Sequence, residues 1–263
     1  MTCRIFVAEP TKFVVAGTQR TGTTLLRTSL SSHPRIVCHG EVFKLGKKPY
    51  ALPGGYWAFT RVDSAHRLQA AFFPRHACRN FLAELYGHRE CSAIGFKLML
   101  DQCEARPYLW PLVLQHQVKT ILVTRRNLLK TLVSRQTAAS TGVYHVSATL
   151  PAKSAVANWA ARPVRIEAAT VIRDLDAIAE ESLEWRRRLE NLEFMELVYE
   201  EYVHDQPHWN ARVLEFLRVP AQALKSDLKK VNPDVLRDLV TNYDEIADVL
   251  RKSPYSFCLG AND

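Results

Sequence analysis

A glycine-rich loop after the first predicted strand constrains the fold most. Residues 12–17 read KFVVAG, a short apolar run that ends in glycine, and residues 23–34 have the apolar spacing of a helix that Pro34 stops. Between them the chain reads GTQRTGTT, from Gly17 to Thr24. A loop that joins a strand to a helix in this way directs backbone N–H groups and the positive end of the helix dipole at one place. The sequence therefore predicts an anion cradle in an α/β fold.

Strands and helices alternate along the rest of the chain. Apolar runs predict further strands at 36–38, 93–100, 120–124 and 194–199. Helices are predicted at 128–139 and across the apolar positions from Ile172 to Leu192. This alternation predicts a parallel β-sheet flanked by helices, whose ligands bind at the carboxyl ends of the strands. We expect one domain over 1–263, with insertions over the site at 44–73 and 141–163.

Composition narrows the possible partners. The chain has 263 residues, 47% of them hydrophobic, which is enough to bury a full core. Its 35 basic and 27 acidic residues leave a net charge of +8, which suits anionic ligands. Six cysteines lack the spacing of metal ligands, so we expect no metal site. No apolar run approaches the roughly 18 residues of a membrane span, and the N-terminus does not read as a signal peptide, which predicts a cytoplasmic protein without a transmembrane segment.

The loop lacks the lysine of an ATP-binding loop. Gly17 and Gly22 have the spacing of the pattern G-x-x-x-x-G-K-[ST], but Thr23 stands at the lysine position. The strand at 120–124 is followed by Arg125 and Arg126, where an acidic residue would help to hold magnesium. Two neighbouring strand ends therefore favour anions, and neither favours a metal. This pattern suggests a nucleotide with two separate anionic groups.

These two segments resemble the cofactor motifs of the sulfotransferases. GTQRTGTTLL resembles their 5′-phosphosulfate loop, and RNLLKTLVS, from Arg126 to Ser134, resembles their 3′-phosphate motif. The later segments VYEEYVHDQPHWNARVLEFLRVP and LVTNYDEIADVLRKSPY are also similar to the family, although Gln206 splits the usual acidic-Pro pair. The bacterial carbohydrate sulfotransferases of the nodulation-factor, lipopolysaccharide and trehalose types are the most similar, because they share the RRN triplet and an arginine in the loop.

The resemblance implies a P-loop NTPase-like sulfotransferase fold and the cofactor PAPS, 3′-phosphoadenosine 5′-phosphosulfate. The product would be 3′,5′-bisphosphoadenosine, and the acceptor a hydroxyl of a small molecule, a glycan or a glycolipid. The cofactor contacts implied by the matching positions are Arg20, Thr21, Gly22, Thr23 and Thr24 for the phosphosulfate, and Arg126 and Ser134 for the 3′-phosphate. Tyr199, at a predicted strand end, would lie against the adenine or in the core.

The same resemblance points to a catalytic base at Glu41. Family members with Gly-Glu at this place are thought to use that glutamate to take the acceptor proton, whereas the alternative is a surface carboxylate paired with an arginine. His39 is the rival base, because an imidazole has the more convenient pKa. Arg20 and Lys97 would stabilise charge on the transferring group, with an ordinary strand-end lysine as the alternative for Lys97.

Two other functions share these features. One is a P-loop kinase-like phosphotransferase, which the missing lysine and acidic residue oppose. The other is a non-catalytic protein that binds a nucleotide or nucleic acid through its basic surface. We expect the sulfotransferase, with no nucleic-acid partner, and the sequence leaves the oligomeric state open. The stretch PYALPGGYWAFT, with Phe72 and Phe73, offers aromatic faces either to an acceptor or to the core of the first insertion.

Overall fold

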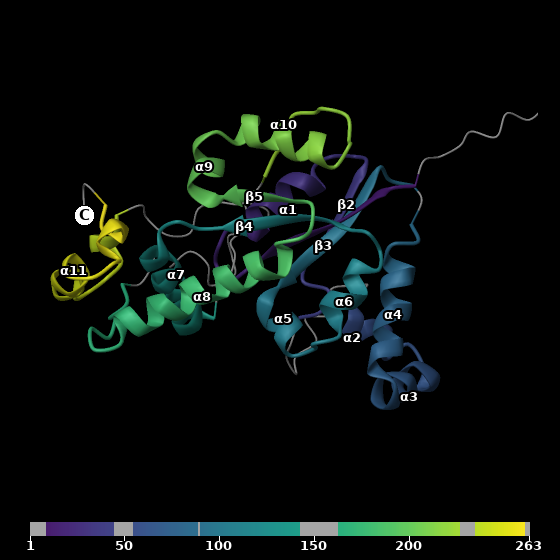
Figure 1. Ribbon diagram of the computed structural model, residues 1–263, viewed down its shortest axis with the longest axis horizontal. Helices are drawn as coiled ribbons and strands as arrows, with labels where there is room; N and C mark the ends of the chain where they lie inside the picture. Colours follow the sequence, from purple (N-terminus) through teal and green to yellow (C-terminus); the bar gives the residue numbers. More distant parts are fainter. Residues whose placement is uncertain (1–8, 45–54, 89, 143–162, 227–234, 261–263) are drawn as a thin grey trace, which may run out of the picture.

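A parallel β-sheet forms the centre of the protein. The computed structural model describes residues 9–44, 55–88, 90–142, 163–226 and 235–260. Within these ranges, parallel strands form a five-stranded sheet in the order β2-β3-β1-β4-β5 (Figure 1). The strands are β1 (Thr11–Gly17), β2 (Ile36–His39), β3 (Ala93–Met99), β4 (Lys119–Thr124) and β5 (Phe194–Val198). The predicted fold class, a parallel sheet flanked by helices with a P-loop-like turn after its first strand, is confirmed.

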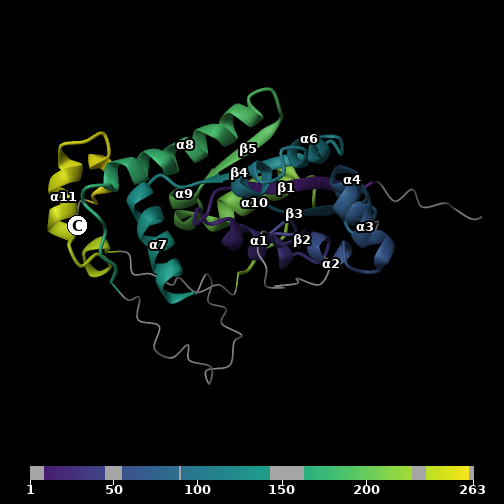
Figure 2. The ribbon, with the colours of Figure 1, turned by 90° about the horizontal axis from the view of Figure 1, so that it is seen from below.

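Helices cover both faces of this sheet, as Figure 2 shows for α8 and α1. The helices of the described ranges are α1 (Thr23–Ser31), α2 (Tyr56–Phe59), α3 (Ser64–Phe72), α4 (Pro74–Leu85), α5 (Leu100–Glu104), α6 (Leu109–Leu114), α7 (Leu128–Thr141), α8 (Val171–Leu189), α9 (Tyr199–His204), α10 (Gln206–Phe216) and α11 (Tyr243–Arg251). Short 3-10 turns lie at Leu236–Asp238 and Ser256–Cys258.

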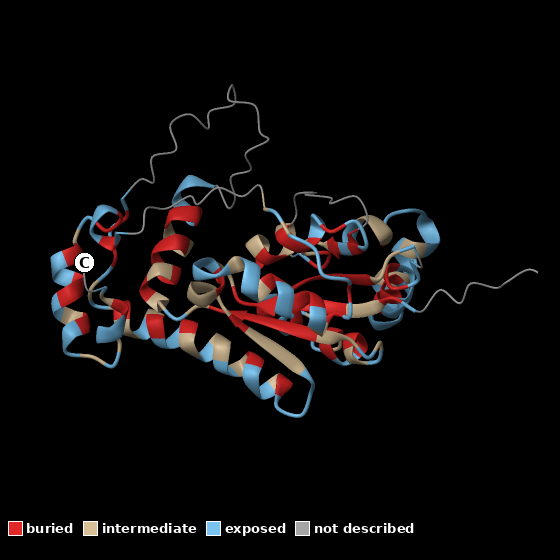
Figure 3. Ribbon diagram, turned by 90° about the horizontal axis from the view of Figure 1, so that it is seen from above, coloured by how far each residue is buried: buried red, intermediate tan, exposed pale blue. Residues whose placement is uncertain are grey.

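The alternation of side chains along β1 divides the core between the two faces. Val14 and Ala16 pack with α4, α6 and the end of α8, while Phe13 and Val15 pack with α1 and α10. All four side chains are fully buried, and Figure 3 shows the central strands in red, the colour of buried residues. A third cluster joins α7, α8 and α11 beyond the edge of the sheet, at the opposite end of the molecule from α3. The sheet is thus held rigidly, which fixes the loops at its carboxyl edge.

The predicted elements are present with small shifts at their ends. Helix α1 ends at Ser31 and not at Pro34, because a proline disfavours helical backbone in the residue before it. The run predicted as a strand over 93–100 ends at Met99, since Leu100 begins α5. Tyr199 begins α9 directly after β5.

The two predicted insertions have different outcomes. In the first, α2 and α3 lie beside α4 at the β2 end of the sheet (Figure 1). Most of the second, 143–162, lies outside the described residues. Their role over a site stays a prediction. Within the described ranges, none of the helices combines the length and the apolar character that a membrane span requires.

Candidate functional site

The loop between β1 and α1 adopts a conformation that requires glycine at position 22. Gly22 has a φ of 97° and forms the N-cap of α1, and Arg20 is also left-handed, with a φ of 70°. A Cβ atom at position 22 would lie 2.3 Å from Cδ2 of Tyr199. Both the backbone conformation and the approaching ring therefore exclude a larger residue. Tyr199, predicted against the adenine or in the core, lies directly on the predicted anion loop.

Donors from three other elements hold this loop by its carbonyl oxygens. Trp185 Nε1 of α8 donates to the oxygen of Gly17 at 2.9 Å. Arg135 Nε of α7 donates to the oxygen of Gln19 at 3.3 Å. Arg125, which follows β4, donates through Nη1 to the oxygen of Arg20, also at 3.3 Å. The loop is thus shaped before any ligand arrives, which is the preorganisation that binding an anion without reorganisation requires.

The loop threonines have different surroundings. Thr21 is buried and its hydroxyl donates to the oxygen of Thr18 at 3.0 Å, so the side chain closes the turn. Thr23 is also buried, at the first position of α1. Thr24 is half-buried, and its Oγ1 accepts a hydrogen bond from Lys97. The first N–H groups of a helix have no acceptor within the helix, so Thr23 and Thr24 stand where an anion binds best.

The two motifs meet at Arg20 and Ser134. Arg20 Nε donates to Ser134 Oγ of α7 at 2.8 Å, although the two residues are 114 positions apart. Ser134 is buried. The arginine expected at the phosphosulfate and the serine expected at the 3′-phosphate therefore lie side by side.

Lys97 and Glu41 form a buried pair beside the loop. Lys97 Nζ lies 3.1 Å from Glu41 Oε1 and 2.9 Å from Thr24 Oγ1, and the lysine is only 5% exposed. Gln102 of α5 donates through Nε2 to the other carboxylate oxygen of Glu41 at 3.0 Å. Burial lowers the pKa of Lys97, while Glu41 acts against that shift. A carboxylate, an ammonium and the loop are thus joined in one network.

His39 lies on the other side of the sheet from this network. In the register of β2 and β3, His39 pairs with Phe96, which packs in the cluster with α4. Side chains alternate along a strand, so Lys97 points to the opposite face, where it contacts Thr24 of α1. Burial lowers the pKa of His39, and the charge of His88 lowers it further. The structure therefore brings Glu41, and not His39, together with Lys97.

Arg126 is exposed and contacts α9. Its guanidinium donates to Glu201 Oε1 at 2.7 Å, and its backbone N–H donates to Glu200 Oε2 at 2.9 Å. The structure pairs Ser134 with Arg20, so the two residues of the predicted 3′-phosphate motif face different partners in this state. Their joint role stays a prediction.

Several residues of this site carry no motif signal in the sequence. Gln102 sits on a five-residue helix, and its contact with Glu41 depends on how β3 and α5 are joined. In the sequence Arg125 is only a positive charge after a predicted strand, but in the structure it is largely buried, its guanidinium lies 4.8 Å from the centre of the Tyr199 ring, and burial lowers its pKa. Glu200 lies in a segment that resembles the sulfotransferases, but its contact with the backbone of Arg126 after β4 is visible only in the structure. Trp185 falls within the helix predicted from the apolar positions between Ile172 and Leu192, and nothing in the sequence links it to the loop.

The side chains around the loop are of the types that bind anions in proteins. Arginine, lysine, serine and threonine donors surround the loop, and the carboxylate of Glu41 pairs with one of these cations, Lys97. Among the described residues no group of three His, Cys, Asp or Glu side chains is arranged to hold a metal ion.

Solved structures with a similar fold include several sulfotransferases. A sulfotransferase from Alicyclobacillus acidocaldarius is 15% identical, with a TM-score of 0.47, over 94% of this chain and 97% of that one. The sulfotransferase domain of the curacin biosynthetic pathway is 13% identical, with a TM-score of 0.48, over 97% of this chain and 85% of that one. A mouse sulfotransferase complexed with PAP is 15% identical, with a TM-score of 0.43, over 95% of this chain and 82% of that one. No protein-family model and no curated protein matches the chain. None of these similarities assigns a role to a residue of this chain.

Proposed function

We propose that this protein is a sulfotransferase that moves the sulfuryl group of PAPS to a hydroxyl of an acceptor. The observation that carries the proposal is the network of Glu41, Lys97 and Thr24 beside the anion loop. It supplies a base, a cation and a hydroxyl at one edge of the sheet, where ligands of parallel sheets bind. The resemblance of the loop and of the 126–134 segment to the sulfotransferase motifs supports the same conclusion.

The donor set fits a nucleotide with two anionic groups. Arg20, Thr23 and Thr24 would hold the 5′-phosphosulfate, with Thr21 and Gly22 shaping the turn around it. Arg126 and Ser134 would hold the 3′-phosphate, and Tyr199 would face the adenine. When bound, PAPS supplies an activated sulfuryl group on a good leaving group.

Glu41 is the proposed base. Its two oxygens accept one hydrogen bond each, from Lys97 and Gln102, and a carboxylate oxygen can accept more than one. Glu41 is therefore oriented by its neighbours and still able to accept the proton of an attacking hydroxyl. Lys97 and Arg20 stabilise the charge that develops on the transferring group. The chain's own task is to align the two reactants and to take up one proton.

The acceptor class follows from the resemblance to the bacterial carbohydrate sulfotransferases. We propose a hydroxyl of a carbohydrate or glycolipid. The aromatic residues of the first insertion support a ring-shaped acceptor, because Tyr56 and Trp57 border a cavity next to the Glu41 segment. Phe72 and Phe73 do not take part, since they are 71% and 67% exposed and do not line that cavity.

A transfer assay tests this function against its rivals. The protein is incubated with PAPS labelled in the sulfuryl group and with fractionated cell extract. The products are then separated, and their masses are determined by mass spectrometry. We expect a labelled product that is heavier than its precursor by one sulfuryl group, formed in the presence of EDTA. Magnesium-dependent turnover of ATP without sulfuryl transfer would favour the kinase-like alternative. Salt-sensitive binding of nucleic acid without any transfer would favour the binding protein.

A further inference from the structure

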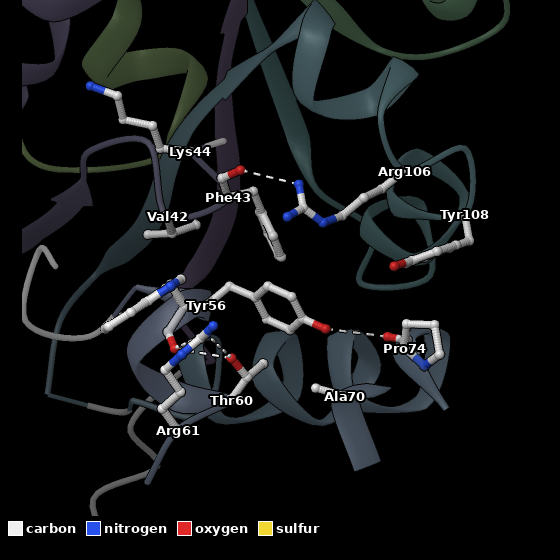
Figure 4. Close-up of a pocket in the computed structure, with 11 residues that line it drawn as sticks. Val42, Phe43, Lys44, Tyr56, Thr60, Arg61, Ala70, Pro74, Arg106 and Tyr108 are labelled. Carbon is white, nitrogen blue, oxygen red and sulfur yellow. Dashed lines mark hydrogen bonds between the residues drawn. The ribbon is translucent and has the colours of Figure 1, made fainter. Parts of the chain in front are cut away.

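A cavity of about 320 Å³ opens directly beside the Glu41 segment (Figure 4). Val42, Phe43 and Lys44 form one part of its wall, and the rest comes from α2, from the α3 and α4 region, and from the chain after α5. Figure 4 shows Arg106 and Tyr108 across the opening from Tyr56 and Pro74. This volume lies in the range of small-molecule sites.

The wall of this cavity is aromatic and cationic. The guanidinium of Arg61 lies 4.2 Å from the centre of the Trp57 ring, and that of Arg106 lies 5.7 Å from the centre of the Tyr56 ring. None of the residues that line the cavity, all of them in the described part of the chain, is acidic. A single arginine packed on an aromatic ring is ordinary. Here two arginines line one cavity and no carboxylate lines it, so the positive charge of the wall is not balanced within the wall.

Both arginines retain donors that their present contacts do not use. Arg106 donates through Nη1 to the oxygen of Phe43 at 3.3 Å. Arg61 also uses Nη1, toward the oxygen of Trp57 at 3.4 Å and Oγ1 of Thr60 at 3.3 Å. Within the described residues neither guanidinium forms an ion pair with a carboxylate, whereas every arginine of α8 does. A guanidinium has five donors, so Nε and Nη2 of each side chain are available to a ligand.

The cavity and the proposed base share their supports. Phe43 follows Glu41 by two residues, and its oxygen is held by Arg106. Gln102, which orients Glu41, lies on α5, and Arg106 comes just after that helix. The same two segments therefore build the base and one wall of the cavity, and Val42, which follows Glu41 directly, lines that cavity while Glu41 does not.

We propose that this cavity binds the acceptor and selects acceptors that carry an anionic group, such as a carboxylate, on a sugar ring. The inference rests on the proposed sulfuryl transfer and deepens it. The aromatic side chains pack against the ring, and the free donors of Arg61 and Arg106 bind the anion by charge-assisted hydrogen bonds. A neutral acceptor of the same shape lacks that second interaction.

A matched pair of glycosides tests this selectivity. The full chain is titrated by calorimetry, with 3′,5′-bisphosphoadenosine present, with 4-nitrophenyl β-D-glucuronide and with 4-nitrophenyl β-D-glucoside, which differ in one carboxylate. We expect the glucuronide to bind at least about tenfold more tightly, the effect of one or more charge-assisted hydrogen bonds. Arg106→Gln should remove most of this ratio, Arg106→Lys should retain part of it, and Arg61→Gln should reduce it less, because that residue is more exposed.

Arg79→Gln serves as the control, since Arg79 is an exposed arginine of α4 that does not line the cavity. It should leave both affinities unchanged.

Equal affinity for the two glycosides, or a ratio that survives both Arg106→Gln and Arg61→Gln, would overturn the inference. Because Arg61 is exposed, its variant stays informative even if Arg106→Gln fails to fold. Bisphosphate binding without selectivity for the glucuronide overturns only the acceptor inference, whereas selective glucuronide binding by a protein that does not bind the bisphosphate supports the anion selectivity of the cavity and overturns the sulfuryl transfer.

Discussion

Two ion pairs at the carboxyl edge of the sheet have opposite surroundings. The side chains of Lys97 and Glu41 are 6% and 17% exposed, while those of Arg126 and Glu201 are 62% and 42% exposed. The buried pair is aligned by Thr24 and Gln102 before any ligand binds. The exposed pair has few restraints, and in the proposed function its arginine would exchange a carboxylate for a phosphate. Chemistry is therefore expected to depend on the buried pair, and affinity to be adjusted at the exposed one.

The largest expected effect is that of Glu41→Gln on the buried pair. The amide keeps the size of the carboxylate and one acceptor oxygen for Lys97, but its NH2 group cannot accept from Gln102 Nε2, and it cannot take the acceptor proton. Transfer should fall by about 100-fold to 10,000-fold, while the affinity for 3′,5′-bisphosphoadenosine stays near that of the wild type. Single-turnover kinetics and calorimetry on the same preparation measure the two quantities.

His39→Asn is the matched control for this change. His39 is on the opposite face of the sheet, so its loss should be much milder. Turnover by Glu41→Gln within a few-fold of the wild type would instead make His39 the leading candidate. In that case the pH dependence of the rate would also show a pKa below the ordinary histidine value of 6.5, because burial lowers the pKa of His39.

Lys97→Met tests the cation of the buried pair. Removing a preorganised donor that acts on developing charge should lower the transfer rate by about 100-fold. Thermal unfolding measured alongside separates this effect from a loss of structure. A rate that stays within a few-fold of the wild type would assign Lys97 to the packing of the strand end.

The pH dependence sharpens the same comparison. Burial lowers the pKa of Lys97 below its ordinary value of 10.5, so its ammonium is lost before that pH is reached. Transfer should therefore decline on the alkaline side below pH 10.5. Between the lowered pKa of Lys97 in the folded chain and its ordinary value of 10.5 in the unfolded chain, the unfolded chain binds more protons than the folded one. The contribution of Lys97 to the free energy of unfolding should therefore increase as the pH rises through this range. Both effects should be absent in Lys97→Met, and an unchanged alkaline limb in that variant would contradict them.

Arg126→Ala tests the exposed pair. We expect about tenfold weaker binding of 3′,5′-bisphosphoadenosine, from the loss of a charge-assisted contact, and little change for AMP, which lacks the 3′-phosphate. Calorimetry with both nucleotides gives the two ratios. An equal loss for both would point to a role for Arg126 in holding β4 and α9 together.

The smallest effect is expected for Glu201→Gln. If Arg126 binds the 3′-phosphate as proposed, Glu201 would compete with that phosphate, so its neutralisation should raise bisphosphate affinity about two- to fivefold at low salt, and less at high salt. Glu193→Gln is the control, because Glu193 forms an exposed pair with Lys119 at the other end of β4. No gain in Glu201→Gln, or the same gain in both variants, would show that this pair does not restrain the arginine.

Elements that lie within one short segment could be predicted from the sequence, whereas contacts between distant segments could not. The strand, loop and helix from Thr11 to Ser31 could be predicted because apolar spacing and glycine positions lie within one short segment. The contact of Arg20 with Ser134 joins residues 114 positions apart, so both could be named but not paired. Gln102 belongs to no motif and follows from the geometry of α5 alone.

Titration with 3′,5′-bisphosphoadenosine and AMP in the presence of EDTA tests the central claim most directly. If the loop and the strand end after β4 bind the two anionic groups of PAPS, the bisphosphate should bind at least about tenfold more tightly than AMP, without magnesium. Equal affinity for the two nucleotides, or binding that appears only with magnesium and ATP, would contradict the assignment of this protein as a sulfotransferase.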